Sequence, residues 1–458
     1  MNRTKKLLLQ TMSLICCICA MTSCANDDYT DAIPANSKAI LSINAKELCA
    51  ATGAKDPELL TMIFGKNDLE NSGLDFSKNI FIFESSDGNL GACIKISDMD
   101  KTSEWLEELK GKGICNKITE KRDFTFTIAK NSWAIAYNDK AMIIQGPVLP
   151  AQQADAIRAA GRYLKQDKDN SLRNAPIIEK LDSIGGPIGI VAQVDALPEK
   201  LAIPFTLGQP KEADASQIMI AASITPNRNG YLLIDGKTFS QDKQINEKLK
   251  KATDKFRKIN GRYTGNIGEN SMCSIFMNVN GNDFASIAHN SSSLGALLAG
   301  ANTAIDMDKI IKCINGEFAI SIDGFEEDDI KMSMIAQLDN KSFLNDVDYW
   351  KKSCPGGTSI ENCGKDFYRF KSDDAPFWFG VSKSDEFFAS SSYDTAKSIL
   401  MPSSSPMPHT ITNIVKGKRL CMILNVSRMT TDNKEMSGVT NALKPLFGEV
   451  KAVIYSMK

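Results

Sequence analysis

The stretch NIFIFESSDGNLGACIKISDMDKTSEWLEELKG (residues 79–111) decides the fold class. Its first half contains two apolar, strand-like runs joined at Asp87-Gly88, a pair typical of a tight hairpin turn. Its second half begins with helix-capping residues, carries acidic residues in the first helical turn and ends near Gly111. The stretch therefore predicts an antiparallel hairpin that leads directly into a helix.

Strand-like and helix-like segments alternate in the same way elsewhere in the chain. Residues 38–44 predict a strand and residues 45–53 a short helix, while residues 123–146 predict a further set of strands. Two helical stretches follow at 150–166 and 171–185. Hairpins combined with helices favour an α+β fold of mostly antiparallel sheets with packed helices.

The same order of segments returns in the second half of the chain. Three pairs of positions correspond, at offsets of 234, 240 and 245 residues: Asn36-Ser37 with Asn270-Ser271, Asp100-Lys101 with Asn340-Lys341, and Trp133 with Trp378. A slowly growing offset is what a tandem duplication with small insertions leaves. The sequence therefore predicts two related halves, residues 34–260 and 261–458, with a Pro- and Ser-rich linker at 401–413 inside the second.

The N-terminus has the features of a secretory signal. Three basic residues precede an apolar run at residues 7–20, which is shorter than the roughly 20 residues that span a bilayer as a helix. The tripeptide Met-Thr-Ser at 21–23 then precedes Cys24, and this arrangement resembles the lipobox of bacterial lipoproteins. In that family the chain is cleaved just before the cysteine, which then carries the lipid.

This resemblance implies a signal peptide at residues 1–23, lipid attachment at Cys24 and a linker at residues 24–33. The segment Asn26-Asp27-Asp28 resembles the acidic export signal of surface lipoproteins in Bacteroidota. We therefore expect a protein held at the outer membrane by its N-terminal lipid and exposed at the cell surface. A periplasm-facing orientation, with the acidic residues as a plain polar linker, is the alternative.

Composition argues against a nucleic-acid partner. The chain has 54 basic and 55 acidic side chains, and without the three basic residues of the signal peptide it has 51 and 55, a formal charge of −4. It lacks a basic stripe with interleaved aromatic residues, which nucleic-acid binding would require. The hydrophobic fraction of 43% is that of an ordinary globular protein.

Most of the twelve cysteines have a simple interpretation. Three leave with the signal peptide and one is the lipid site, while Cys93, Cys273 and Cys421 lie in apolar runs, where cysteine behaves as a small buried hydrophobe. Cys354 and Cys363 bracket the loop CPGGTSIENC. An oxidising compartment permits a disulfide there, and the sequence leaves a disulfide and two free thiols equally open.

Motifs for catalysis are incomplete. His289 and His409 lack partners at the spacing of a metal site or a catalytic triad, which favours two polar surface histidines. Ser240 and Lys243 match S-x-x-K without its companion motifs, and Ser240 is predicted to cap the helix that follows. The acidic cluster at 323–329 lacks calcium-loop spacing and predicts a charged hairpin turn. The sequence implies no cofactor and no metal.

The opening IPANSKAILSINAKEL (residues 33–48), the lipobox and the repeated hairpin-into-helix pattern resemble an uncharacterised family of gut Bacteroidota envelope lipoproteins, a domain of unknown function. The resemblance covers nearly the whole mature chain and implies no catalytic residues. Ser183 and Thr395 also resemble O-glycosylation acceptors of these bacteria, and roles at helix ends are the alternative for both.

Three hypotheses about function follow. The first is a non-enzymatic, lipid-anchored envelope protein that binds a ligand at the junction of its two halves. The second is a hydrolase that acts on glycan or peptide through paired carboxylates, whose separation the sequence does not show. The third is a structural or adhesive surface module. Catalysis is left open, with the balance toward a binding protein.

Overall fold

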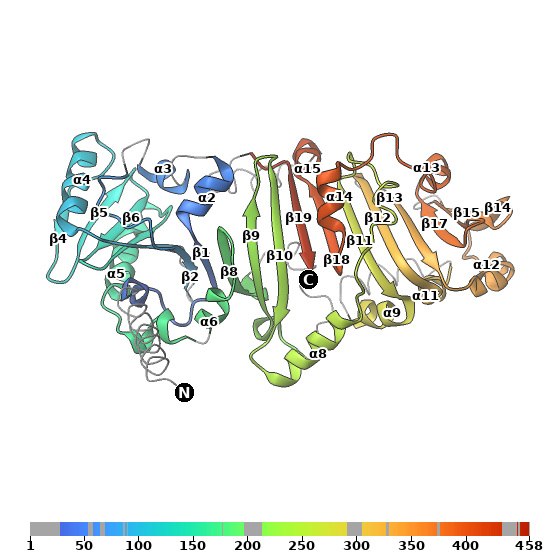
Figure 1. Ribbon diagram of the computed structural model, residues 1–458, viewed down its shortest axis with the longest axis horizontal. Helices are drawn as coiled ribbons and strands as arrows, with labels where there is room; N and C mark the ends of the chain where they lie inside the picture. Colours follow the sequence, from blue (N-terminus) through green and yellow to red (C-terminus); the bar gives the residue numbers. More distant parts are fainter. Residues whose placement is uncertain are drawn as a thin grey trace, which may run out of the picture. The chain divides into compact units, whose positions relative to one another are not determined.

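The computed structural model describes residues 28–53, 58–64, 69–85, 88, 90–175, 177–196, 213–290, 305–326, 329–372, 376–432, 447 and 449–457. The chain divides into two compact units (Figure 1). The first comprises Met1–Cys49 with Lys55–Ser183, and the second comprises Ala50–Ala54 with Ile184–Lys458. Among the described residues, no helix has the length and apolar character that a bilayer-spanning segment needs.

The first unit is built on an antiparallel sheet. Its described strands lie in the order β1-β2-β3-β7-β6-β5-β4. They are β1 (Ala39–Ile43), β2 (Ile80–Glu84), β3 (Leu90–Lys95), β4 (Thr119–Glu120), β5 (Thr125–Ala129), β6 (Trp133–Tyr137) and β7 (Ala141–Gln145). The helix after β1 is α2 (Ala45–Thr52). The other helices of this unit are α3 (Glu58–Phe64), α4 (Met99–Gly111), α5 (Gln153–Tyr163) and α6 (Ile177–Asp182).

The strands and the helix within residues 79–111 form as the sequence predicts, and the turn residue Asp87 lies outside the described residues. Strands β2 and β3 pair antiparallel, with Phe81 opposite Cys93. Asp98 caps α4, because its carboxylate accepts a hydrogen bond from the Lys101 backbone at 3.1 Å. The apolar face of α4 buries Trp105 and its neighbours against the unit's core.

The second unit contains a larger sheet. Its described strands lie in the order β8-β9-β10-β19-β18-β11-β12-β13-β17-β16-β15-β14, and β10–β19 is the one parallel pair among them. They are β8 (Ile188–Gln193), β9 (Met219–Pro226), β10 (Tyr231–Phe239), β11 (Cys273–Asn280), β12 (Ile314–Glu326), β13 (Asp329–Leu338), β14 (Ser359–Gly364), β15 (Phe367–Lys371), β16 (Phe377–Val381), β17 (Glu386–Ser390), β18 (Leu420–Asn425) and β19 (Ala452–Met457). The predicted fold class, α+β with mostly antiparallel sheets and packed helices, is confirmed.

Adjacent strand residues of the second unit belong to two separate cores, because they point to opposite faces of the sheet. Met277 belongs to the core that packs against α9 (Gly281–Asn290), α11 (Met307–Lys312) and α12 (Val347–Ser353). Phe276 belongs to the other core, which α13 (Tyr393–Ser398) and α14 (His409–Val415) cover. The remaining helices are α8 (Lys243–Asp254), whose Leu249 packs near β9, and α15 (Val426–Asp432).

The two units share a strand order. Strands β11 to β17 follow one another across their sheet in the sequence β11-β12-β13-β17-β16-β15-β14, which repeats the order of β1 to β7. The predicted duplication stays a prediction, and this order is consistent with it. The boundary between units lies at Ser183, earlier than the predicted boundary near residue 260, because β9 and β10 continue into the second sheet through β19.

Parts of both predicted linkers form helices. Asp28–Ala32 form a 3-10 helix, η1, in which Tyr29 is buried and donates a hydrogen bond to the Asn79 carbonyl at 2.9 Å. The Asp28 carboxylate lies 3.6 Å from the Lys140 ammonium, so the part of the predicted linker 24–33 that starts here is folded. In the linker predicted at 401–413, α14 begins at His409, because Ile411 and Val415 pack into the core.

Candidate functional site

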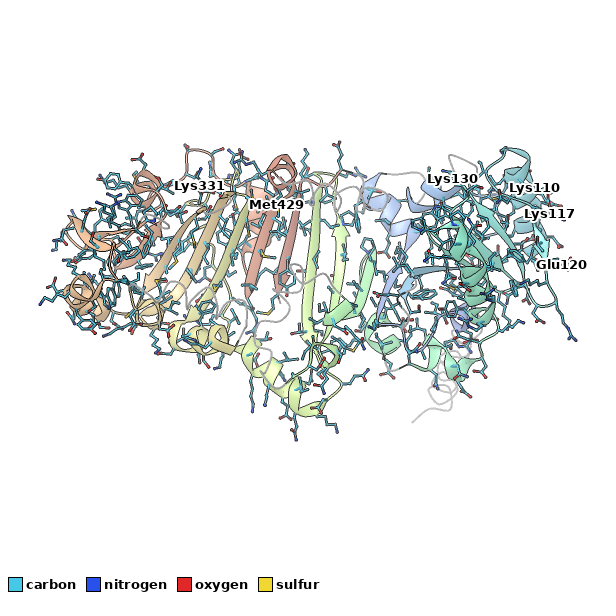
Figure 2. The ribbon with its side chains drawn as sticks, turned by 180° about the vertical axis from the view of Figure 1, so that it is seen from behind. Lys110, Lys117, Glu120, Lys130, Lys331 and Met429 are labelled. Carbon is cyan, nitrogen blue, oxygen red and sulfur yellow. The ribbon has the colours of Figure 1, made fainter. Side chains whose placement is uncertain are left out.

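A polar pocket lies in the second unit, with a volume of about 490 Å³. Four parts of the chain line it: residues within 266–271, Ser321 and Asp323 of β12 with Ser333 of β13, residues within 395–405, and Arg428 of α15. Lys331, two residues before the pocket residue Ser333, and Met429, next to Arg428, both lie along the upper edge of this unit in Figure 2. The lining therefore combines the sheet, the helices α13 and α15, and the irregular segments at 266–271 and 399–405.

A row of serines crosses the sheet at the floor of the pocket. Strand pairing places Ser274 opposite Ser321, Ser321 opposite Ser333, and Ser333 opposite Ser390. All four are buried, on the face whose core α13 and α14 cover. The apolar core thus gives way to hydroxyl groups at this row, and Ser321 and Ser333 are the two members that line the pocket.

Two hydroxyl groups of the pocket lining are joined by hydrogen bonds. Ser271 and Ser321 share a hydrogen bond at 2.7 Å, and the Ser321 hydroxyl also donates to Asp323 at 2.8 Å. Ser333 is only 2% exposed, and it lines the pocket. A serine hydroxyl both donates and accepts, so Ser333 offers a hydrogen-bonding group at the floor of the pocket.

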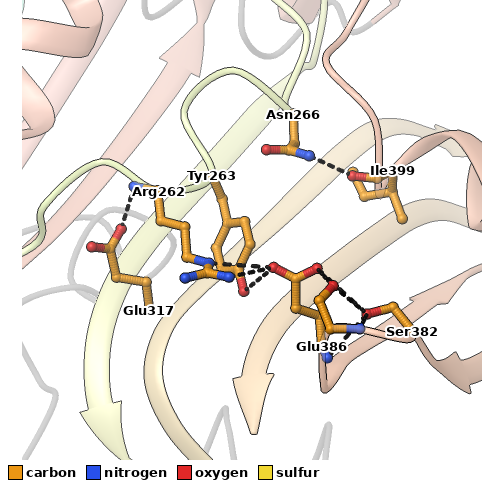
Figure 3. A network of polar contacts seen from close by, with 8 residues as sticks. Arg262, Tyr263, Asn266, Glu317, Ser382, Glu386 and Ile399 are labelled. Atoms are coloured by element: carbon orange, nitrogen blue, oxygen red, sulfur yellow. Dashed lines mark hydrogen bonds and ion pairs between the residues drawn. The ribbon is translucent and has the colours of Figure 1, made fainter.

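A network of carboxylates holds the loop at residues 260–263, which leads to the pocket wall that starts at Asn266 (Figure 3). The buried Glu317 of β12 accepts backbone hydrogen bonds from Asn260, Gly261 and Arg262 at 2.7, 3.0 and 2.7 Å. Asn266 then donates its side-chain amide to the Ile399 carbonyl at 2.9 Å, which joins two walls of the pocket. The pocket is therefore held in shape by the protein itself.

The charged groups of the lining are few. Asp323 is the one carboxylate and Arg428 the one guanidinium among the lining residues. Glu269 lies behind the wall, where the Ser405 hydroxyl donates to it at 2.8 Å. A glycosidase of the usual kind needs two facing carboxylates, and the lining supplies one. The lining residues that the structure describes can hydrogen-bond polar groups, and Asp323 is the one carboxylate among them.

The histidines lie outside the pocket. His289 on α9 hydrogen-bonds Asp308 on α11 at 2.8 Å, at the face opposite to the pocket. His409 is the first residue of α14 and is exposed. No cluster of His, Cys, Asp and Glu that could hold a metal ion is present in the described part of the chain.

The residues predicted to carry a glycan, a lipid or the export signal lie in different parts of the chain. Ser183 is exposed just after α6, and its hydroxyl donates to the Lys180 carbonyl at 2.7 Å. Thr395 lines the pocket, and the cap of its helix is Ser392 rather than Thr395. Cys24, Asn26 and Asp27 lie outside the described residues.

Cys354 and Cys363 are free thiols in the structure. Cys354 ends α12 and packs against the core on one face of the sheet, whereas Cys363 on β14 packs against the core on the other face. The Cys354 thiol donates to the Trp350 carbonyl at 3.3 Å instead. Of the two readings that the sequence leaves open, the structure has the free thiols, because the sheet separates the side chains.

One helix cap differs from the prediction, and two tryptophans occupy corresponding strands. Asp242, not Ser240, caps α8, since its carboxylate accepts from the Gln244 and Ile245 backbone at 2.8 and 3.0 Å. Trp133 and Trp378 occupy the corresponding strands β6 and β16, and both are only partly buried. Part of the acidic cluster at 323–329 lies outside the described residues, and its first member, Asp323, lines the pocket.

The fold and the pocket together define an α+β protein whose second unit carries a polar pocket. A family model described as a domain of unknown function, DUF4836, matches residues 58–402, and the chain belongs to that family.

No curated protein matches the chain. Two solved structures are similar to parts of it. One is crystal form IV of TP0453, with a TM-score of 0.25 and 9% identity, which covers 39% of this chain and 68% of that chain. The other is crystal form III of TP0453, with a TM-score of 0.25 and 12% identity, and the match covers 37% of this chain and 66% of that chain. At these TM-scores the likeness carries no argument about this protein.

Proposed function

We propose that this protein is a lipid-anchored binding protein of the cell envelope, which holds a small polar ligand in the pocket of its second unit. The pocket carries the binding role. Its volume falls within the roughly 300–1,000 Å³ of small-ligand sites. Two of its wall segments are joined by the hydrogen bond from Asn266 to the Ile399 carbonyl, which lowers the ordering cost of binding.

A binding role fits the pocket better than hydrolysis. The one carboxylate of the lining, Asp323, already accepts a hydrogen bond from Ser321. Neither histidine lines the pocket, so the serine hydroxyls have no imidazole beside them of the kind that a Ser-His pair uses. The pocket offers recognition groups, without the paired acid and base that glycan or peptide cleavage uses.

The anchor rests on the sequence before Asp28. An apolar run, small residues and Cys24 stand in lipobox order, and two or three acyl chains on Cys24 would hold the protein firmly at a membrane. Because η1 starts at Asp28, the extended chain from Cys24 spans at most roughly 14 Å. The anchor would therefore keep the first unit close to the bilayer surface.

Lipid attachment is tested by Cys24→Ala, with Cys49→Ala as the matched control. We expect the unchanged protein and the Cys49 variant to incorporate labelled palmitate and to enter the detergent phase of Triton X-114. The Cys24 variant should do neither. Palmitate incorporation that survives in the Cys24 variant overturns the lipid site.

Orientation is tested by protease treatment of intact cells that carry a C-terminal epitope on the protein. We expect loss of the epitope without lysis, with a periplasmic marker protein intact in the same sample. Protection of the epitope until lysis would instead place the protein on the periplasmic side and remove the export role of Asn26-Asp27-Asp28.

A further inference from the structure

We propose that the ligand of the pocket is a neutral mono- or disaccharide, and this inference rests on the binding function proposed above. Eight of the lining residues carry a hydroxyl group and two carry an amide. A serine or threonine hydroxyl both donates and accepts, as does each hydroxyl of a sugar. A lining of this kind matches a polyhydroxylated ligand more closely than it matches one with a single strong charge.

The charges of the lining point to a ligand without net charge. Asp323 and Arg428 are its two charged residues and cancel each other. A carboxylate accepts from neighbouring sugar hydroxyls and a guanidinium donates to them, so both have a role with a neutral sugar. The carboxylate of Asp323 would repel a strongly anionic ligand, and the guanidinium of Arg428 would repel a cationic one.

The apolar part of the lining suits the carbon face of a sugar ring. Ile267, Ile399, Met401 and Pro402 line the pocket beside the hydroxyl groups. Two of them, Ile267 and Ile399, are buried members of the core that α13 and α14 cover. A ring could therefore rest its C–H groups on this wall and turn its hydroxyls toward the serines.

Ser333 is the group that a ligand would change most. It is 2% exposed, and it lies in the sheet at the floor of the pocket, which it lines together with Ser321. A sugar hydroxyl that reached it would gain a hydrogen bond in a place with little access to water. Ser274 offers a matched comparison, because it lies in the same cross-strand row, is 1% exposed, and is not among the lining residues.

The test measures binding to the full-length mature chain by titration calorimetry and thermal shift. The neutral probes are glucose, galactose, mannose, xylose, N-acetylglucosamine, maltose, lactose and cellobiose, and the charged probes are galacturonate, glucosamine and L-glutamate. We expect at least one neutral sugar to bind more tightly than every charged probe. Ser333→Ala should weaken its binding by about two- to tenfold, the range of one hydrogen bond, and Ser274→Ala should leave it unchanged.

Each other outcome has a definite meaning. If charged probes bind and neutral sugars do not, the saccharide inference is wrong and the binding function stands. If no probe of either panel binds, both proposals are overturned. If a neutral sugar binds and the Ser333 and Ser274 variants behave alike, the sugar site is not this pocket.

Discussion

The Arg262 guanidinium donates to one oxygen of Glu386 through both Nε and Nη2, at 3.3 and 3.0 Å. The backbone N–H of the same residue donates to Glu317 at 2.7 Å, so Arg262 ties its loop to β12 and β17 at once. The hydrogen bond to Glu386 raises the pKa of Arg262, and burial, followed by the charge of Glu386, raises that of Tyr263. The loop that leads to the pocket is thereby fixed at its base.

Glu317→Gln should destabilise the second unit. The carboxylate accepts three backbone hydrogen bonds, and an amide keeps one accepting oxygen and turns an NH2 group toward the remaining donors. Hydrogen bonds to a charged group contribute about 1.5–3 kcal/mol each, so we expect the free energy of unfolding to fall by about 2–3 kcal/mol. Urea unfolding followed by tryptophan fluorescence measures the change.

Glu247→Gln is the control for this substitution. Glu247 is exposed on α8 of the same unit, and the same change there should alter the free energy of unfolding by less than about 0.5 kcal/mol. Equal effects of the two substitutions would show that the Glu317 contacts do not stabilise the loop.

Local elements could be predicted from the sequence where capping and alternation agree. The hairpin at residues 79–96 and the helix after Asp98 follow from turn residues and apolar spacing alone. The cap of α8 was misplaced by two residues, because Ser240 and Asp242 are both good caps and the tertiary contact of Ser240 with the Gln217 carbonyl decides between them. The helix at His409 was missed, because three prolines precede or adjoin a segment whose helix is stabilised by burial.

The pocket could not be predicted from the sequence. Its lining residues stand far apart along the chain, and only the pairing of β12 with β13 brings Ser321 and Ser333 together. A single buried serine in a strand has no distinctive pattern. The one available signal was the unusual density of serine at 403–405, which the composition alone assigns to a linker.

Gly281→Ala should destabilise the packing of α9 on α11. A Cβ at this position would lie 1.8 Å from the Ile311 carbonyl oxygen, a backbone atom that cannot turn away. Relief requires the two helices to separate, and overpacking of this kind costs about 1–3 kcal/mol. We expect a loss near the upper end of that range in the free energy of unfolding, measured by urea denaturation.

Gly356→Ala is the matched control for the glycine substitution. No atom lies within 4 Å of a Cβ built there, so the free energy of unfolding should change by less than about 0.5 kcal/mol. A Gly281 variant as stable as the Gly356 variant would mean that α9 and α11 are not packed as closely as the structure has them.

The buried thiols should be unreactive in the folded protein, with a definite pH dependence. Burial raises the pKa of Cys115 to about 11 and the pKa of Cys421 to about 12. The reactive form is the thiolate, and an unperturbed cysteine has a pKa of about 8.5. A raised pKa lowers the thiolate fraction at any pH below it, so alkylation of both by iodoacetamide at pH 8 should be at least about 100-fold slower than after unfolding.

Between pH 8 and pH 10 the alkylation rate of the folded protein at Cys115 and Cys421 should rise about tenfold for each pH unit, because the thiolate fraction grows in that proportion below the pKa. Peptide mass mapping separates these residues from Cys354, which is only half-buried and should react before them.

Because Cys354 and Cys363 are free thiols, we expect both to be alkylated after unfolding without a reducing agent. Alkylation of Cys421 as fast as Cys354 at pH 8 would contradict the core of the second unit, because a thiol enclosed between α14 and the sheet cannot reach the reagent.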